Sequence, residues 1–286
     1  EVMELRRAEQ IRKLAGDSWE TPIEAARHST GAHAERRQQP LVCLPIRVAG
    51  GQQLVAVEDR VGARQEAQRL DRLAQLAPQL PGADALAVAR RYASADAFGR
   101  TLGFAAANAL TRCLYDRTGF AAPASRDSIG QMEPRAGEQI GMIGLFRPLL
   151  GRVLESGARL TVVELNPALA GEADGYRVTL DATELESCDK VVSTSTLLLN
   201  DTLDRMLGHC RQARWFAMVG PGAGCLPDAL FARGVTLIGG NRIDDGPGFI
   251  EALRRGESTS RYSTKSALTP DSYPGFAALL ERAKIA

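Results

Sequence analysis

The strongest constraint on the fold is an alternation of apolar runs and helical segments that begins at residue 139. The apolar runs have the length and composition of buried strands, and they are Gln139–Ile143, Arg159–Glu164, Arg177–Leu180, Lys190–Thr194, Trp215–Val219 and Thr236–Ile238. Helical spacing of apolar residues marks Leu145–Glu155, Thr202–Gln212, Asp228–Ala232 and Pro247–Arg254. Strands that are apolar throughout are typical of a parallel sheet covered on both faces. The alternation therefore predicts a doubly wound, Rossmann-like α/β domain with a mostly parallel sheet.

The N-terminal half has a different pattern, in which two successive strands are followed by several helices. Two β-rich runs, Leu41–Val48 and Gln53–Val57, flank Ala49-Gly50-Gly51, whose glycines suit a hairpin turn. Helices are predicted in residues 2–27 (two short ones), at Val61–Leu76, at Ala83–Arg91 and at Ala95–Tyr115. Ser94 is the expected N-cap of the last helix, with Asp96 in its first turn. This order is that of a separate α+β unit.

The segment 119–137 separates the two patterns. It contains Pro123, Pro134 and several glycines and charges, and only Ile129–Met132 has an apolar period. We therefore predict an α+β domain with N-terminal helices over residues 1–125 and a Rossmann-like domain over 126–286. Beyond Gly256 we expect a loop followed by a short helix at Phe276–Lys284.

Composition narrows the class of protein. The chain has 286 residues, 44% hydrophobic and 24% charged, as expected of a globular protein with one large or two ordinary domains. A net charge of +1 argues against a nucleic-acid partner. No apolar run approaches a membrane span, and the charged N-terminus lacks the core of a signal peptide, so we expect a cytoplasmic protein. A homodimer is compatible with these features.

Polar and glycine-rich loops follow the predicted strands. In a doubly wound sheet, ligands bind outside the carboxyl ends of the strands, so these loops should share one edge. The candidate ligand-binding residues on this edge are Gly141, Gly144, Glu164, Thr194, Ser195, Thr196, Asn200, Gly220 and Pro221. Each has a simpler explanation: helix caps for the hydroxyl cluster and Asn200, a turn at Gly220-Pro221-Gly222, and a cap at Asp244 or Asp245. Their concentration at one edge favours a binding site.

The glycines of the first strand and turn raise a second candidate function. Gly141 and Gly144 lie where a strand runs into a helix, and Glu164 ends the next strand about twenty residues on. This is the order of a dinucleotide-binding unit, with NAD(P) or S-adenosylmethionine as cofactor and Glu164 on the ribose. The spacing is GxxG rather than GxGxxG, however, and Pro148 lies in the first helical turn. The nucleotide hypothesis is the alternative to simple ligand binding.

Asn108 stands alone as a polar residue in a helix rich in small side chains. Gly103 and the alanines at 105–107 would let another backbone approach closely. A mid-helix Asn is unfavourable by propensity and needs a partner. That partner is either a nearby loop or a ligand at the domain junction, and the sequence supports both equally.

Metal and catalytic signatures are sparse. The five cysteines form no CxxC and the three histidines no HxxxH, so a conventional zinc site is not expected. Cys225 follows the glycine-rich segment at the edge, and together with Glu164 it is the candidate ligand for a divalent or soft transition metal. Cys188 precedes a strand and should lie at the opposite end. No nucleophile elbow or Walker lysine is present, so no reaction or catalytic residue is assigned.

Several motifs in order resemble a known family. They are DSIGQMEPRAGEQIGMIGLFRPLL, LTVVELNP, DKVVSTSTLLLNDTLDRML, MVGPGAG and LPDALFARGVTLIGG, and the earlier TLGFAAANAL resembles a helix of the same family. Over roughly residues 40–256 the chain is similar to the "putative heavy-metal chelation" family, first catalogued as a domain of unknown function. Two residues depart from the family's pattern: Asp201 replaces a common Gly, and Gly222 replaces a frequent Ser.

The resemblance implies a Rossmann-like domain preceded by a smaller domain similar to the N-terminal domain of enolase. It also implies a cleft between them, lined by the helix of Asn108 and by the polar edge, that binds or processes a metal chelate or metallophore-like compound. Hydrogen bonds would come from Asn108, Thr194, Ser195, Thr196, Asn200 and Gly220. The departures at Asp201 and Gly222 bear on ligand preference rather than on the fold.

Overall fold

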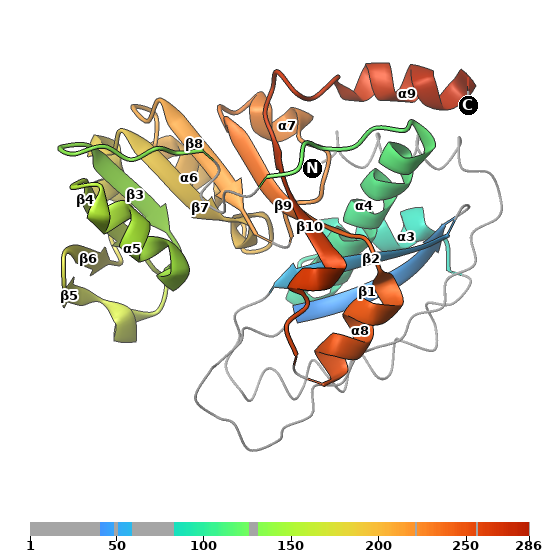
Figure 1. The fold of residues 1–286 in the computed structure, drawn as a ribbon, viewed down its shortest axis with the longest axis horizontal. Coiled ribbons are helices and arrows are strands. Elements are labelled where there is room, and N and C mark those ends of the chain that lie inside the picture. Colours follow the sequence, from blue (N-terminus) through green and yellow to red (C-terminus); the bar gives the residue numbers. More distant parts are fainter. Residues whose placement is uncertain are drawn as a thin grey trace.

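The structure is a computed structural model, which describes residues 83–125, 131–220, 222–255 and 257–285 and the backbone of two strands, 41–48 and 51–58. The predicted helices at residues 2–27 and Val61–Leu76 lie outside the described residues, as does Pro221. Figure 1 shows a twisted sheet flanked by helices, with the hairpin of the N-terminal half beside one edge.

An eight-stranded sheet forms the centre of the molecule. Its strands are β3 (Gln139–Ile143), β4 (Arg159–Val163), β5 (Gly171–Ala173), β6 (Tyr176–Thr179), β7 (Lys190–Thr194), β8 (Trp215–Val219), β9 (Leu237–Ile243) and β10 (Ser263–Leu268). They lie in the order β10-β9-β8-β7-β3-β4-β6-β5. Neighbours from β9 to β6 pair in parallel, and only the outer strands β10 and β5 are antiparallel. The predicted Rossmann-like α/β fold is confirmed.

The strand order reverses direction beside β3. The chain builds outward from β3 through β4 to β6, then returns to place β7 on the other side of β3. Neighbouring loops therefore leave the sheet in opposite directions at the carboxyl ends of β3 and β7. Such a switch point opens a crevice in which α/β proteins bind ligands.

Helices cover both faces of the sheet. The α-helices of this half are α5 (Arg147–Glu155), α6 (Leu203–His209), α7 (Asp228–Phe231), α8 (Gly246–Arg254) and α9 (Phe276–Ile285). Short 3-10 helices are η3 (Pro167–Leu169), η4 (Ala182–Ser187), η5 (Ser195–Leu198) and η6 (Ser260–Tyr262). Successive strand residues alternate between two apolar clusters: Ile140 and Met142 join one, Ile143 the other. Burial on both faces explains why these strands read as continuous apolar runs.

The N-terminal half packs against one of these faces. The hairpin pairs β1 (Leu41–Val48) with β2 (Gly51–Glu58), and α3 (Ala85–Ala89), η2 (Arg90–Ala93) and α4 (Ala97–Arg117) follow. Helix α4 contacts both hairpin strands, and it shares an apolar cluster with η5, α7 and α9 (Figure 1). One hydrophobic cluster thus spans the predicted domain boundary at residues 125 and 126, and the division into two domains remains a prediction.

Helix α4 needs its small residues, as the sequence predicted. A Cβ at Gly103 would lie 2.0 Å from the backbone nitrogen of Tyr92, so η2 crosses α4 in direct backbone contact. The predicted cap was wrong: Asp96, rather than Ser94, is the N-cap and accepts a hydrogen bond from the Gly99 N–H. Ser94 instead accepts a hydrogen bond from the Asp96 N–H. Both residues are good caps, and the helix begins at the later one.

The segment after residue 256 is more regular than expected. The sequence predicted a loop, but β10 adds an antiparallel strand to β9. On the other side of β10, the Ser125 N–H donates to the Lys265 carbonyl, and the Ala267 N–H donates to the Pro123 carbonyl. Residues just after α4 therefore cover the edge of the sheet. None of the described helices is long and apolar enough to cross a membrane.

Candidate ligand site at the carboxyl edge of the sheet

Helix α4 carries Asn108 to the carboxyl edge of the sheet. The side chain is buried, with 2% of the residue exposed. Its Nδ2 donates a hydrogen bond to the Gly222 carbonyl at 3.0 Å. Its Oδ1 is buried and has no hydrogen-bond partner among the described residues. The helix propensity argument predicted a loop or a ligand as the partner of Asn108, and the loop satisfies only one end of the amide.

The Gly222 carbonyl determines how the Asn108 amide is turned. Only the NH2 group can hydrogen-bond a carbonyl oxygen, so the Oδ1 atom must point elsewhere. A buried acceptor without a partner costs about 1–3 kcal/mol. Nearly all buried polar atoms in folded proteins have partners, so this exception calls for a functional or structural explanation.

The loop after β8 is shaped by its glycines. Gly220 has φ +147°, and a Cβ there would lie 2.4 Å from the Ser195 Oγ. A Cβ at Gly222 would lie 3.2 Å from the same oxygen and 3.4 Å from the Phe104 ring. A Cβ at Gly240 of β9 would lie 2.8 Å from the Ala223 carbonyl oxygen. Glycine is therefore required for the loop to lie close to Ser195 on one side and β9 on the other.

Ser195 is the first residue after β7 and lies against this loop. It is 2% exposed, and its hydroxyl makes no hydrogen bond with any described residue. The neighbouring threonines are used locally: the Thr194 hydroxyl accepts hydrogen bonds from the backbone and the hydroxyl of Thr196. Capping therefore explains Thr194 and Thr196, as the simpler interpretation proposed, but it does not explain Ser195.

Asn200 and Asp201 lie at the exposed end of the same loop. Asn200 accepts hydrogen bonds from the N–H and hydroxyl of Thr202, which is the local turn expected of a capping residue. Asp201 has φ +56° and forms an ion pair with Arg100 of α4. The left-handed backbone explains why glycine suits this position, and the ion pair ties the loop to α4.

Glu164 binds the backbone of the loop that follows β3. Its Oε1 accepts a hydrogen bond from the Leu145 N–H at 2.6 Å, and its Oε2 accepts one from its neighbour Leu165 at 3.1 Å. The residue is 5% exposed. The Gly144 N–H is bound as well, to the Val163 carbonyl. Glu164 thus positions the β3–α5 turn from β4.

These contacts bear on the nucleotide hypothesis. The phosphate of a nucleotide cofactor would need free N–H groups where β3 runs into α5. The N–H groups of Gly144, Leu145 and Phe146, however, already have protein partners. Gly141 lies within β3 rather than in the turn, and a Cβ there would meet Leu185 at 2.8 Å. Gly141 therefore serves packing inside the sheet, and the structure gives the nucleotide hypothesis no support.

Comparison with known proteins identifies the family of this chain. A family model described as "putative heavy-metal chelation" (DUF364) matches residues 127–270, which are half of the chain. The chain belongs to this family. An uncharacterized protein of Methanocaldococcus jannaschii is 31% identical over 156 residues, which cover 53% of this chain and 58% of the relative. The chain therefore matches less than two thirds of that relative.

Solved DUF364 structures show the same fold. A protein of unknown function from Pyrococcus horikoshii matches with a TM-score of 0.64 at 19% identity, covering 93% of this chain and 99% of the other. One from Desulfitobacterium hafniense matches with a TM-score of 0.63 at 20% identity, covering 93% and 98%. The predicted membership of this family is confirmed, whereas the enolase-like character of the N-terminal half remains a prediction.

The DUF364 description names heavy metals, but the possible metal ligands of this chain do not lie together in the described ranges. Glu164 and Cys225, the predicted ligands, follow β4 and β8, and two strands lie between these in the sheet. Within the described ranges, no three His, Cys, Asp or Glu side chains converge on one point. Cys188 lies at the amino end of β7, as predicted; burial raises its pKa to about 11 and that of Cys210 to about 12. Neither thiol is ionised at neutral pH.

Asp244 and Asp245, which follow β9, both form hydrogen bonds that stabilise the local structure. Asp245 caps α8 by accepting a hydrogen bond from the Gly248 N–H, as the simpler interpretation proposed. Asp244 is bound by Arg242 and by the Thr264 hydroxyl of β10. Burial acts to raise the pKa of Asp244, but these two hydrogen bonds and the charge of Arg242 outweigh it and lower the pKa. Asp244 therefore stays ionised and is no candidate proton donor at neutral pH.

The structure thus brings together part of the predicted set. Asn108, Ser195, Gly220 and Gly222 meet where α4 crosses the ends of β7 and β8. Gly144 and Glu164 lie beyond β7 on the same edge, at the ends of β3 and β4. The sequence had not singled out Phe104 or Gly224, although both lie in the segments it selected. We call Asn108, Ser195, Gly220, Gly222 and Gly224 the α4 junction.

Proposed function

We propose that this protein binds a small molecule, a metal chelate or metallophore-like compound, at the α4 junction. The observation that carries the proposal is the Asn108 Oδ1, a buried acceptor left without a partner beside the switch point of the sheet. A bound ligand would supply the missing hydrogen bond. The unbonded Ser195 hydroxyl next to the same loop supports the proposal, because it offers a second polar contact.

The family description supports a metal-containing ligand, and the donor groups at the junction suit its organic part. An amide oxygen and a hydroxyl recognise organic groups by hydrogen bonds. Leu165 and Leu180, 66% and 51% exposed, follow β4 and β6 farther along the same edge and would contact only a ligand long enough to extend from the junction past β3. We therefore propose that the chelator, rather than a set of protein side chains, holds most of the metal's coordination positions.

Equilibrium dialysis tests this function. The wild-type protein is dialysed against Ni²⁺ or Zn²⁺, alone and with citrate or free histidine as chelator, and bound metal and chelator are quantified by elemental analysis and mass spectrometry. We expect metal and chelator to be retained together. Asn108→Leu should lower retention at least tenfold, whereas Gln212→Leu, an exposed amide before β8 at the opposite edge, should leave it unchanged. Retention of nothing by the wild type would overturn the proposal.

A further inference from the structure

We infer that the α4 junction selects a hydrogen-bond donor, namely a neutral or cationic N–H or O–H group such as an amide, amine or hydroxyl. By the same geometry it rejects a carboxylate or phosphate at that position. The inference rests on the proposed function and specifies the chemistry of the ligand group that reaches Asn108.

The Asn108 amide has a fixed direction. Its NH2 group is held by the Gly222 carbonyl at 3.0 Å. Turning the amide over would set two oxygen atoms against each other and break that bond. The protein therefore presents an oxygen, not an N–H, to anything that binds beside Asn108. An oxygen of this kind accepts hydrogen bonds and repels anionic groups.

The surroundings of the α4 junction offer no free positive charge among the nearest described side chains. The side-chain atoms nearest to Gly220, Gly222 and Gly224 belong to Ser195, Phe104 and Asn108, and all three residues are uncharged. Arg100, two turns earlier on α4, is paired with Asp201. Arg112, one turn after Asn108, is paired with Asp116. The two arginines of α4 nearest to Asn108 in the sequence thus already have anionic partners, and an anion at the junction would lose its hydration without gaining their charge.

Gly224 controls the approach of a small group to the Asn108 side chain. Gly224 is exposed, and a Cβ there would lie 3.6 Å from the Asn108 Cγ and 3.8 Å from its Nδ2. Gly224 therefore lies between solvent and the Cβ–Nδ2 side of Asn108, and its missing side chain leaves room there for a small group beside the amide. A large side chain at this position would close that approach without changing Asn108.

The Ser195 hydroxyl is compatible with this selection. A hydroxyl both donates and accepts, so it can bind a donor or an acceptor on the ligand. The discrimination must therefore come from Asn108, which only accepts at its unpartnered atom. A site whose buried polar group hydrogen-bonds the ligand strongly rejects an analogue that lacks the matching group. An apolar site discriminates much less against a ligand that is smaller by one methylene.

The test compares acetamide with acetate, which have nearly the same shape but differ in charge and in their N–H donors. Both probes, and inorganic phosphate, are titrated into the full-length ¹⁵N-labelled protein, and the amide signals of Gly222 and Gly224 are followed. We expect acetamide to shift both signals with at least tenfold higher affinity than acetate or phosphate. Asn108→Leu and Gly224→Phe should both abolish the acetamide shifts, whereas Gln212→Leu should retain them.

The outcomes separate the two proposals. If acetate or phosphate shifts the junction signals as strongly as acetamide while metal chelates are still retained in dialysis, the donor selection is wrong and the binding function stands. If no probe shifts the signals and no chelate is retained, both proposals fail. If acetamide binds equally well to the Gly224→Phe protein, with its fold verified by the same spectra, the binding position is wrong.

Discussion

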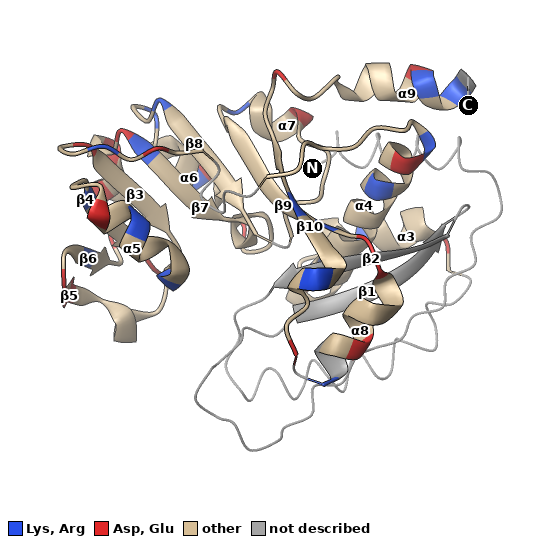
Figure 2. Cartoon of the chain, in the orientation of Figure 1, with Lys and Arg blue, Asp and Glu red and all other residues tan. Residues whose placement is uncertain are grey.

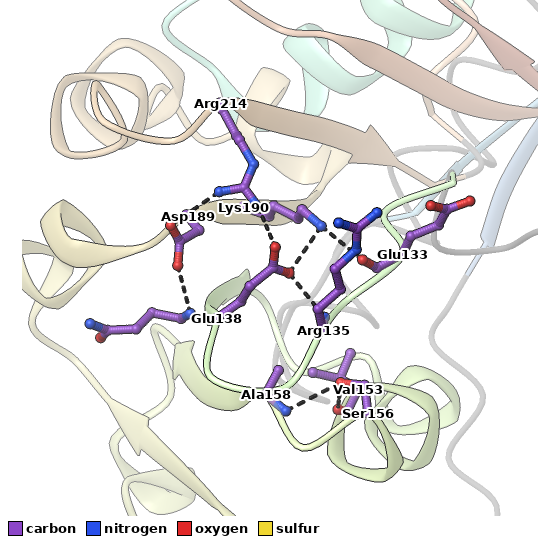
Figure 3. A network of polar contacts seen from close by, with 10 residues as sticks. Glu133, Arg135, Glu138, Val153, Ser156, Ala158, Asp189, Lys190 and Arg214 are labelled. Atoms are coloured by element: carbon purple, nitrogen blue, oxygen red, sulfur yellow. Dashed lines mark hydrogen bonds and ion pairs between the residues drawn. The ribbon is translucent and has the colours of Figure 1, made fainter.

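The two ends of the central sheet differ in how they treat buried polar groups. At the amino ends of β3, β7 and β8, Lys190 donates to Glu138 at 2.9 Å and to the Glu133 carbonyl at 2.7 Å (Figure 3). Arg214 pairs with both Glu138 and Asp189, and the Gln139 N–H donates to Asp189. Each charge of this network has a partner of opposite sign or a backbone group.

At the carboxyl end of the sheet, the hydrogen bonding of the polar groups is less complete. There the Asn108 Oδ1 and the Ser195 hydroxyl have no partners among the described residues. Elsewhere on the described chain, acidic and basic residues are interspersed over helices and strands (Figure 2). The charged network at the amino end is complete, whereas the carboxyl end keeps an unused hydrogen-bond acceptor, where the proposed ligand would bind. Substitutions at the two ends should therefore have different consequences.

The largest effect is expected from Lys190→Met. Lys190 and Glu138 have side chains only 9% and 13% exposed, so removing the cation leaves a largely buried carboxylate with only the half-exposed Arg214 as its charged partner. The free energy of unfolding should fall by about 3 kcal/mol, measured by urea denaturation. Arg214→Gln, which removes a cation that is 54% exposed, should cost less than about 1 kcal/mol. Equal losses for the two variants would contradict this assignment.

Gly220→Ala should have a smaller effect on stability and a strong effect on binding. The φ of +147° and the contact with the Ser195 Oγ make any side chain unfavourable, at a cost of about 2 kcal/mol. Gly208→Ala is the matched control, because a Cβ in this position of α6 would meet nothing within 4 Å. It should stabilise the protein by about 0.5–1 kcal/mol. Unfolding curves and chelate retention together would show whether loop shape, rather than stability alone, controls binding.

The amino end should also show a defined pH dependence. Burial acts to raise the pKa of Glu138, but hydrogen bonds from Lys190 and the Arg135 N–H, with the charges of Lys190 and Arg214, lower it below 4.5. The folded state therefore binds a proton less readily than the unfolded state. The stability contributed by Glu138 is present above about pH 4.5 and is lost as the pH falls through its folded pKa.

Comparison of wild type with Glu138→Gln measures this contribution. The difference between their unfolding free energies should be largest near neutral pH and should shrink steadily below about pH 4. A difference that stays constant between pH 7 and pH 3 would show that the charge of Glu138 is not what stabilises the amino end.

The smallest effect is expected at Asp201, on the carboxyl side. Asp201→Ala keeps the left-handed backbone and loses the ion pair with Arg100, so it should destabilise the protein by about 1 kcal/mol. Asp201→Gly loses the same pair but relieves the backbone strain, so its stability should lie within about 0.5 kcal/mol of wild type. The order of the two variants in thermal unfolding is the decisive measurement, and a less stable Gly variant would show that strain is unimportant here.

The sequence predicted most of the sheet because strands that are buried on both faces consist of continuous apolar residues, which are easily recognised. Gln139–Ile143, Lys190–Thr194 and Trp215–Val219 were predicted with the bounds that the structure shows. Strand β10 was missed because STKSAL is polar and lies at an edge, where only part of a strand is buried. Strand β5 has three residues, all exposed, and has no apolar signal at all.

The site was less predictable than the fold. The sequence placed Ser195 at the carboxyl edge because the carboxyl ends of parallel strands meet there, and it singled out Asn108 as the lone polar residue of a small-residue helix. In the structure both residues lie against the loop after β8. It could not show that Glu164 would turn onto the backbone of Leu145, or that Thr194 would cap η5, because both depend on a few ångströms of loop geometry. Local hydrogen bonds decide which polar side chains remain free to bind a ligand, and these bonds cannot be predicted from the order of residues in the sequence.

The pairing of residues 123–125 with β10 has a consequence for biosynthesis. The segment that leaves α4 is anchored by backbone hydrogen bonds to Lys265 and Ala267, and Phe276 at the start of α9 is bound in turn to Asp228 of α7. During synthesis, α4 leaves the ribosome long before these anchors exist. The edge of the sheet beside α4 is therefore completed only when nearly the whole described chain has been made, so a nascent or C-terminally clipped protein would lack both β10 and the anchor of the segment that leaves α4.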